Sequence, residues 1–156
     1  MDVRIERALT TDAEEILALQ KLAYRSEAEL YRNYGIEPLV QTIEHVKLQF
    51  QNHTVLKAVS DGSIVGSVRA YANDGTCFIG KLIVHPGYQG RGIGTTLMNA
   101  IETFRPAGRY ELFTGSKSVN NIRLYHRLGY RIFKYETVEP DWGLVFLEKN
   151  REIQPL

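Results

Sequence analysis

The chain has 156 residues, of which 44% are hydrophobic and 24% charged, so it suits one globular domain and is short for two. Its 19 basic and 18 acidic side chains leave a net charge of +1, which gives no reason to expect nucleic acid or an anionic membrane as the main partner. No apolar run approaches the roughly 18 residues that cross a bilayer, and the N-terminal segment lacks the apolar run of a signal peptide. The single cysteine, Cys77, cannot form an intramolecular disulfide. These features predict a cytoplasmic protein.

The first third of the chain is predicted to be mainly helical. Residues 3–6 alternate apolar and charged side chains, which indicates a short half-buried strand. Thr11 or Asp12 can then cap a helix whose apolar residues recur at helical spacing. The segment 26–38 is polar and aromatic without clear periodicity, and a second helix is predicted over about residues 39–50.

From residue 54 the apolar pattern changes to a period of two, which is typical of strands. The segments 55–59, 64–71 and 77–84 each read as a strand. Asp61-Gly62 and the segment 73–75 are turn sequences between them. We therefore expect an antiparallel meander of three strands.

The second half of the chain is predicted to alternate helices and strands. A helix follows the glycine-rich segment and stops before Pro106. The remaining predicted elements are a strand over 110–114, a helix over 120–128 closed by Gly129, and strands over 130–135 and 143–148. This element order predicts an α+β domain with a mixed sheet.

Three alternating glycines, Gly90, Gly92 and Gly94, lie between the third strand of the meander and the following helix. Glycines let the backbone approach a ligand closely. The unpaired amides at the start of the helix carry the positive end of its dipole, which makes an anion site. The segment therefore predicts a cradle for a pyrophosphate.

Two common phosphate-binding motifs do not match this segment. A P-loop needs a lysine after its last glycine, whereas Thr95 follows Gly94 directly. The dinucleotide fingerprint needs the spacing Gly-x-Gly-x-x-Gly in a βαβ unit, whereas this segment is Gly-x-Gly-x-Gly after a meander. Both interpretations are disfavoured.

The sequence V-H-P-G-Y-Q-G-R-G-I-G over residues 84–94 resembles the acetyl-CoA motif of the GNAT superfamily, Gln/Arg-x-x-Gly-x-Gly/Ala. Gln89, Gly92 and Gly94 occupy its defining positions. Residues 121–130 resemble the superfamily helix that ends in Tyr-x-x-x-Gly-Phe/Tyr. The resemblance implies one GNAT-like domain over residues 1–156, with a mixed, mostly antiparallel sheet, a splayed central strand pair and flanking helices.

The resemblance also implies that acetyl-CoA is the co-substrate. The superfamily often has an asparagine that contacts pantetheine seven residues before its tyrosine, and here that position is Ser118. Asn120 and Asn121 are the alternatives, and Asn121 lies one helical turn before Tyr125. The residues expected to bind the cofactor are Leu82, Ile83, Val84, Gln89, Gly90, Arg91, Gly92, Ile93, Gly94, Thr95, Ser118 and Asn121. Tyr125 is expected to protonate the departing thiolate, since thiol and phenol pKa values of about 8.5 and 10 make this transfer feasible.

The other catalytic roles carry weaker sequence signals. Glu111, on the strand beside the expected cleft, is the candidate general base, and an exposed sheet residue is the competing interpretation. Acceptor specificity in this superfamily usually comes from the first helices and their loop, so the residues expected to bind the acceptor are Glu29, Tyr31, Tyr34 and Tyr71. The four histidines have no metal-ligand spacing, so no metal is expected.

The resulting hypothesis is an N-acetyltransferase that acetylates a primary amine by direct attack in a ternary complex. The alternative is a non-enzymatic module that binds or senses acyl-CoA, and an intact Tyr125 favours the enzyme. A nucleic-acid-binding accessory protein is disfavoured by the charge balance. The expected partner is a small-molecule or peptide amine, and the sequence leaves both its identity and homodimerisation open.

Overall fold

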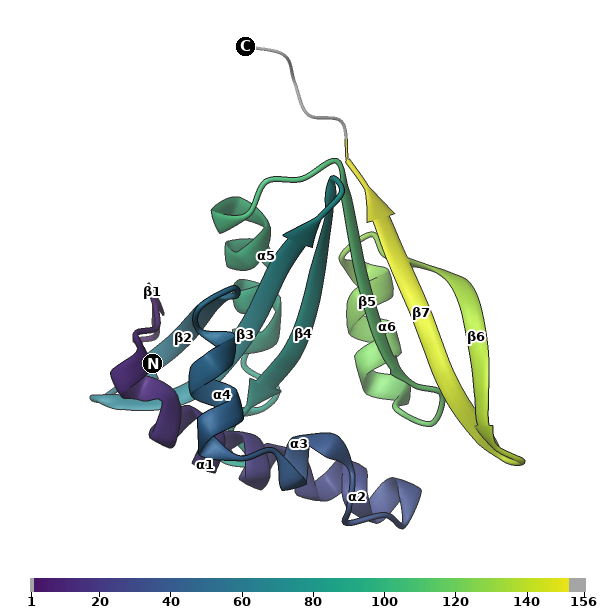
Figure 1. The fold of residues 1–156 in the computed structure, drawn as a ribbon, viewed down its shortest axis with the longest axis horizontal. Coiled ribbons are helices and arrows are strands. Elements are labelled where there is room, and N and C mark those ends of the chain that lie inside the picture. Colours follow the sequence, from purple (N-terminus) through teal and green to yellow (C-terminus); the bar gives the residue numbers. More distant parts are fainter. Residues whose placement is uncertain (1, 152–156) are drawn as a thin grey trace.

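The computed structural model describes residues 2–151, which form one seven-stranded sheet in the order β1-β2-β3-β4-β5-β7-β6 (Figure 1). The strands are β1 (Arg4–Arg7), β2 (Thr54–Ser60), β3 (Ser63–Asn73), β4 (Thr76–Val84), β5 (Arg109–Gly115), β6 (Arg131–Glu139) and β7 (Trp142–Asn150). The α-helices are α1 (Ala13–Ala23), α2 (Arg25–Tyr31), α3 (Glu37–Val40), α4 (Ile43–Gln49), α5 (Ile93–Phe104) and α6 (Val119–Arg127). The α+β fold is the one expected from the sequence.

The predicted meander is confirmed, because β2, β3 and β4 pair antiparallel in sequence order. Asp61 and Gly62 both have positive φ, 50° and 78°, in the turn between β2 and β3. Two such residues in succession give the turn whose twist matches a hairpin. The Asp-Gly signal therefore identified the hairpin turn correctly.

The central strand pair β4 and β5 separates along its length. The two strands are parallel neighbours only over Thr76–Phe78 and Arg109–Glu111. Beyond these residues they diverge, and the gap widens toward the carboxyl end of β4 (Figure 1). The splayed pair expected from the resemblance is thus present. It exposes strand edges and side chains in the middle of the sheet.

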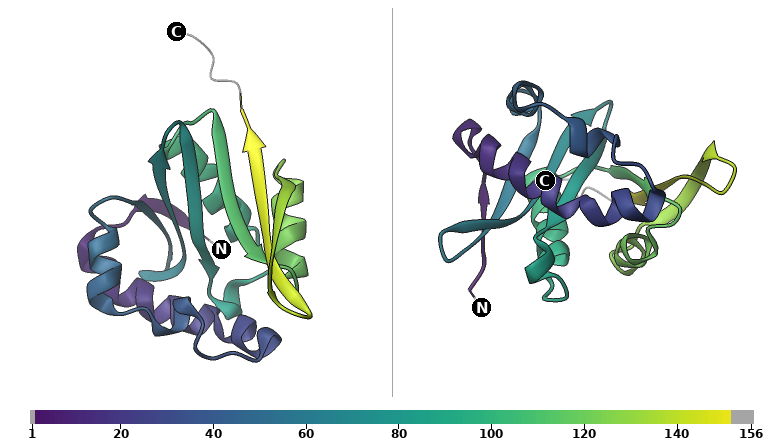
Figure 2. Two further views of the ribbon diagram at one scale, coloured as in Figure 1. Left: turned by 45° about the vertical axis from the view of Figure 1, so that its right-hand side comes forward. Right: turned by 90° about the horizontal axis from the view of Figure 1, so that it is seen from below.

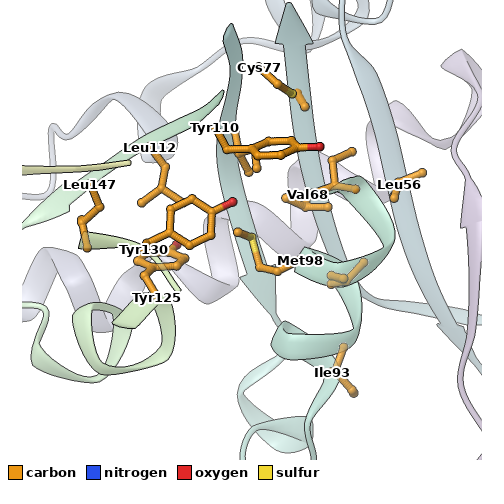
Figure 3. Packing of buried hydrophobic residues seen from close by; sticks show 14 of the residues in the cluster. Leu56, Val68, Cys77, Ile93, Met98, Tyr110, Leu112, Tyr125, Tyr130 and Leu147 are labelled. Carbon is orange, nitrogen blue, oxygen red and sulfur yellow. The ribbon is translucent and has the colours of Figure 1, made fainter. Parts of the chain in front are cut away.

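The helices cover both faces of the sheet, with α1 to α4 on one face and α5 and α6 on the other (Figure 2). Successive strand residues point to opposite faces, so Val55 joins the cluster under α1 while Leu56 joins the cluster under α5. Helix α5 contributes Leu97 and Met98 to the latter cluster, which also contains Tyr110 and Tyr125. Met98 and the two tyrosines can be followed in Figure 3. The amphipathic spacing of this helix was visible in the sequence.

The helix predicted over residues 39–50 is wrong in one respect, because the structure divides it into α3 and α4. Gln41 is extended, with ψ 134°, and the Thr42 side chain accepts a hydrogen bond from the amide of His45 as the cap of α4. A side chain that bonds the backbone in this way ends one helix and begins another.

Helix α2 occupies the segment for which the sequence predicted no element. Ala28 is its one buried residue within the described structure, so the helix has no apolar stripe from which it could be recognised. None of the helices within residues 2–151 combines the length and apolar character needed to cross a membrane.

Candidate active site

Two cavities open where β4 and β5 diverge. The strand cavity, of about 510 Å³, lies over the sheet and is lined by residues from α2 to α4, β3, β4, β5 and α6, and by Tyr24, which connects α1 to α2. The loop cavity, of about 560 Å³, lies against the glycine-rich segment and α6. Four residues line both cavities, namely Tyr24, Glu27, Leu82 and Asn121. The two cavities therefore meet at a shared boundary.

The loop cavity is built largely from backbone. Gly90 and Gly92 have φ of 76° and 83°. Residues that carry a Cβ adopt this backbone conformation only at an energetic cost. Gly92 caps α5 without any side-chain hydrogen bond to the first turn. The amides at the start of this 12-residue helix consequently keep their donors for a ligand, at the positive end of the helix dipole. This arrangement fits a pyrophosphate.

Every residue predicted to bind the pyrophosphate or, on β4, the pantetheine arm lines the loop cavity in the structure, except Arg91. The residues in question are Leu82, Ile83, Val84, Gln89, Gly90, Gly92, Ile93, Gly94 and Thr95. Arg91 instead places its guanidinium over the ring of Tyr88, 5.2 Å from the centroid. Residues 89–95, the part predicted to bind the pyrophosphate, are consecutive in the sequence, so they come together without any long-range contact.

Strand β4 carries a β-bulge at the boundary of the two cavities. Ser67 pairs with Ile83 and Arg69 with Gly80, so two residues of β4, Lys81 and Leu82, oppose one residue of β3. Lys81, in the bulge, has φ of 52°. A bulge takes backbone groups out of the sheet ladder, which makes amides of this stretch of β4 available to a ligand in the cleft.

Tyr125 projects from α6 into the core beside the strand cavity (Figure 3). Its side chain is 7% exposed, and its ring lies 6.1 Å from that of Tyr130. Burial raises the pKa of the Tyr125 hydroxyl, and the nearby Tyr24 and Glu27 raise it further. The hydroxyl is thus a protonated hydrogen-bond donor at neutral pH.

Ser118 and Asn121, two of the alternatives for the pantetheine contact, have different surroundings. Asn121 lines both cavities, and its Nδ2 donates to Thr114 Oγ1 at 3.5 Å. Ser118 is 4% exposed and is not among the described residues that line either cavity. The geometry therefore favours Asn121 for a ligand contact.

Ser118 belongs to a chain of hydrogen bonds that ends on Glu27. The amide of Lys117 donates to Tyr31 Oη at 3.0 Å, and Ser118 Oγ donates to Glu27 Oε2 at 2.6 Å. Tyr31 Oη and Ser118 Oγ are 2.8 Å apart. Because the serine proton is given to Glu27, Tyr31 donates to Ser118. The chain fixes one carboxylate oxygen of α2 against the start of α6.

Two carboxylates of the strand cavity differ in their partners. Glu111 Oε1 lies 2.8 Å from Arg109 Nη1, and the same guanidinium binds Glu148 at 3.0 Å. Glu27 forms no ion pair with any described residue and lines both cavities. Glu27 is therefore a carboxylate at the boundary of the two cavities without an ion-pair partner among the described residues, which suits a proton acceptor.

The residues expected to bind the acceptor are only partly brought together. Tyr71 lines the strand cavity, stacked 5.2 Å from Phe78 and edge-on to His53 at 4.9 Å. Tyr31 lies behind the cavity wall, where it holds Ser118. Glu29 and Tyr34 are exposed, Tyr34 by 64%, and neither lines a cavity in the described structure.

Neither cavity contains, among the described residues, a cluster for metal binding or a cysteine. Within residues 2–151 no cluster of histidine, cysteine and carboxylate side chains could hold a metal ion. Cys77 is buried, and burial raises the pKa of its thiol to about 11. A thiol with that pKa is a poor nucleophile at neutral pH.

Sequence reasoning missed several residues that line the strand cavity. Tyr24 and Glu27 come from the end of α1 and from α2, Arg69 from β3, and Gln49 from the end of α4. None of them belongs to a motif. The charged residue within an otherwise buried strand, Arg69, was the one local signal that could have indicated a polar site.

The profile of the acetyltransferase (GNAT) family matches residues 14–130, three quarters of the chain. The chain belongs to this family. A relative in Bacillus subtilis (strain 168), UPF0157 protein YqkA, is 29% identical over 136 residues, which are 86% of this GNAT chain and 38% of the relative. The chain thus spans well under half the length of that relative.

Solved structures share the fold over nearly the whole GNAT chain. The PaiA N-acetyltransferase from Thermoplasma acidophilum, in complex with coenzyme A, has a TM-score of 0.78 and 16% identity, covering 97% of this chain and 100% of its own. The ribosomal-protein-S18-alanine N-acetyltransferase from Escherichia coli has a TM-score of 0.75 and 15% identity, covering 99% and 97%. These similarities establish the GNAT fold.

Proposed function

We propose that this GNAT-family protein transfers the acetyl group of acetyl-CoA to a primary amine by direct attack in a ternary complex. The observation that carries the proposal is the boundary between the two cavities. One cavity has the backbone cradle for a pyrophosphate, the other contains carboxylates and a buried tyrosine, and both are lined by Tyr24, Glu27, Leu82 and Asn121. Two reactants bound side by side can react there with little loss of entropy.

In this proposal the loop cavity holds acetyl-CoA, which supplies the thioester that is cleaved. The amides of residues 89–95 bind the pyrophosphate, and the edge of β4 from Leu82 to Val84 binds the pantetheine arm by backbone hydrogen bonds. Asn121 is the side chain proposed to contact pantetheine. An amide of the β4 bulge at Lys81 and Leu82 is the group proposed to donate to the thioester oxygen, where charge develops.

The strand cavity holds the amine in the proposed complex, with Tyr71 as part of its wall. A primary amine is mostly protonated at neutral pH, so it must lose a proton before it attacks. We assign this proton to Glu27, which the bond from Ser118 holds in place. Glu111 is the alternative base, but accepting a proton there means disrupting its ion pair with Arg109.

Tyr125 is proposed to assist the leaving group. As the amine nitrogen forms its bond to the acetyl carbon, the carbon–sulfur bond breaks and the sulfur takes up negative charge. The Tyr125 hydroxyl donates a hydrogen bond and then its proton to that sulfur, and the phenolate is reprotonated by the second proton that the nitrogen must lose to become the amide. The buried position of the phenol, which raises its pKa, keeps it in the donor form.

A screen of primary amines with acetyl-CoA, read as thiol release and confirmed by mass spectrometry of the product, tests the proposal. Transfer to at least one class of amine is the expected result. Tight CoA binding with no transfer across small amines, amino acids and peptide N-termini would indicate the acyl-CoA sensor instead.

Thermal-shift titration tests the cofactor separately from the chemistry. Ligand stabilisation grows with the logarithm of concentration over the dissociation constant, so equal concentrations rank the ligands. Acetyl-CoA is expected to raise the melting temperature more than NAD or ATP does. A larger shift with either of these nucleotides would contradict the assignment of the loop cavity.

A further inference from the structure

Arg69 is a buried cation at the strand cavity. It lies in the middle of β3, its side chain is 2% exposed, and it lines the cavity on the face covered by α1 to α4. Its guanidinium donates to the amide oxygens of three glutamines: to Gln20 at 2.5 Å, to Gln49 at 2.7 Å and to Gln41 at 3.5 Å. All three partners are neutral.

No ion pair within the described residues therefore neutralises the charge of Arg69, and the Glu37 carboxylate acts on it only at a distance. Within residues 2–151 no carboxylate forms an ion pair with this guanidinium, and its Nε is a buried nitrogen without a hydrogen-bond partner. Arginine stays protonated at neutral pH. A buried charge that lacks a counter-ion is destabilising in general, and an unsatisfied donor adds to this cost. The structure retains both at the wall of a cavity.

Space for a counter-ion exists beside the guanidinium. Gly80 is the direct partner of Arg69 in the ladder of β3 and β4, and directly opposite residues share one face of the sheet. Gly80 lines the cavity, and a Cβ built on it would meet no atom within 4 Å. The place where a cross-strand side chain would cover Arg69 is thus open.

Gln49 supplies a position that a carboxylate can take. Its Oε1 accepts from Arg69 Nη1 at 2.7 Å and from Gln41 Nε2 at 3.0 Å, so two donors converge on one neutral oxygen. The side chain is half-buried at the cavity wall. A carboxylate oxygen in its place would keep both donors and add the missing negative charge.

The other charges of the cavity are already balanced, except one. Glu37 pairs with Lys81 at 2.6 Å and Glu111 pairs with Arg109 at 2.8 Å. This leaves Arg69 as the cation and Glu27 as the anion without an ionic partner among the described lining residues. Tyr24 interacts electrostatically with both Arg69 and Glu27. Burial and the Glu27 carboxylate raise the pKa of its hydroxyl, and the Arg69 guanidinium lowers it.

We propose that the acceptor is an amino acid or a similar small molecule that carries a carboxylate together with its amine, and that Arg69 is the counter-ion of this carboxylate. This inference rests on the proposed function, because it names the substrate of the same site. The amine then lies toward Glu27 and the thioester, and the carboxylate lies toward Arg69, Gln49 and Gly80. The competing explanation is that Arg69 only ties β3 to α1 and α4.

Matched pairs of amines separate these explanations. Glycine, β-alanine, γ-aminobutyrate and leucine are each compared with their primary amides, and kcat/KM is measured for both members. The variants are Gln49→Glu, which provides Arg69 with a carboxylate from the protein itself, and Gln51→Glu, which adds the same charge at an exposed position two residues away. Melting temperatures verify that both variants fold.

The readout is the change in the acid-to-amide ratio of kcat/KM between wild type and variant, because the amines of acids and amides differ in basicity. For the best pair, Gln49→Glu is expected to lower this ratio at least tenfold, or about 1.4 kcal/mol, and Gln51→Glu is expected to leave it within about twofold. An unchanged ratio in Gln49→Glu would overturn the inference while leaving N-acetyl transfer intact.

If no amine is acetylated by the wild-type protein, the proposed function fails and binding decides the inference. Calorimetric titration of the CoA-saturated protein with the same acids and amides is then expected to give tighter binding of the acids, lost in Gln49→Glu and kept in Gln51→Glu. Equal binding of acids and amides by the wild type would assign Arg69 a structural role.

Discussion

The two cavities of the cleft are built by different means. The loop cavity owes its cradle to consecutive residues, 89–95, whose backbone amides are proposed to bind the pyrophosphate. The strand cavity is assembled from residues of α2, α3, α4, β3, β4, β5 and α6 and of the connections between elements, which are up to 101 residues apart in the chain, from Tyr24 to Tyr125. The first depends on local conformation, and the second depends on the packing of the whole domain.

This difference predicts how each cavity responds to change. A backbone cradle tolerates most side-chain substitutions, except where a positive φ or a new charge intervenes. The strand cavity depends instead on individual side-chain groups, such as the Glu27 carboxylate at the end of a hydrogen-bond chain of four residues. Removing one such group should abolish its function while leaving cofactor binding unaffected.

The largest effect is expected for Glu27→Gln. Without a proton acceptor, turnover at neutral pH should fall by roughly 10²- to 10⁴-fold, while acetyl-CoA affinity should stay nearly unchanged. The matched control is Glu111→Gln, for which we expect a much smaller loss. Steady-state kinetics with the best amine gives the comparison. A larger loss in Glu111→Gln would transfer the base role to Glu111.

Tyr125→Phe should lower the single-turnover rate of acetyl transfer by about 10²-fold, because the hydroxyl that protonates sulfur is removed. Ring volume and packing against Tyr130 are retained, so stability and acetyl-CoA binding should change little. Single-turnover measurement is needed because slow product release can mask the chemical step. A wild-type rate in this variant would leave Tyr125 with a structural role alone.

Gly92→Asp tests the loop cavity. The carboxylate would occupy the pyrophosphate site, and acetyl-CoA affinity should fall more than tenfold, or about 1.4 kcal/mol. Gly75→Asp is the matched control, because Gly75 has a similar φ, 80° against 83°, and lies in the turn between β3 and β4. The two variants share the backbone strain, so a difference in calorimetric affinity reports on the cradle.

The smallest expected effect is a dependence of stability on pH that arises from two buried tyrosine hydroxyls. Burial raises the pKa of Tyr125 and Tyr130 above the ordinary value near 10. Since the unfolded phenols lose their protons first, the stability that these groups contribute is present below about pH 10 and is lost as the pH rises further. Chemical denaturation between pH 8 and 11 measures this loss, which should be shallower in Tyr130→Phe.

Stability that stays constant up to pH 11 would contradict the burial of these hydroxyls. Tyr130→Phe carries a cost of its own, because Tyr130 Oη donates to Glu102 Oε2 at 3.0 Å. The slope with pH, not the absolute stability, is therefore the quantity to compare between the variant and the wild type.

The sequence by itself determined the fold class, the meander and the loop cavity. Asp61-Gly62 indicated a hairpin because the φ values of its turn suit few other residues. The glycine-rich segment indicated an anion site because its amides and the helix that they begin are consecutive in the chain. In both cases the interactions that matter are local, so the residue types alone determine them.

Only the tertiary structure decided the strand cavity. Glu27 lies on a helix without an apolar stripe, and its relation to Ser118, 91 residues later, follows from how α2 packs against the start of α6. Arg69 looks like any charged residue in a strand until three glutamines from α1, α4 and the segment before α4 surround it. Such groups are brought together by the packing of distant elements, and no local pattern of residue types records which of them will meet.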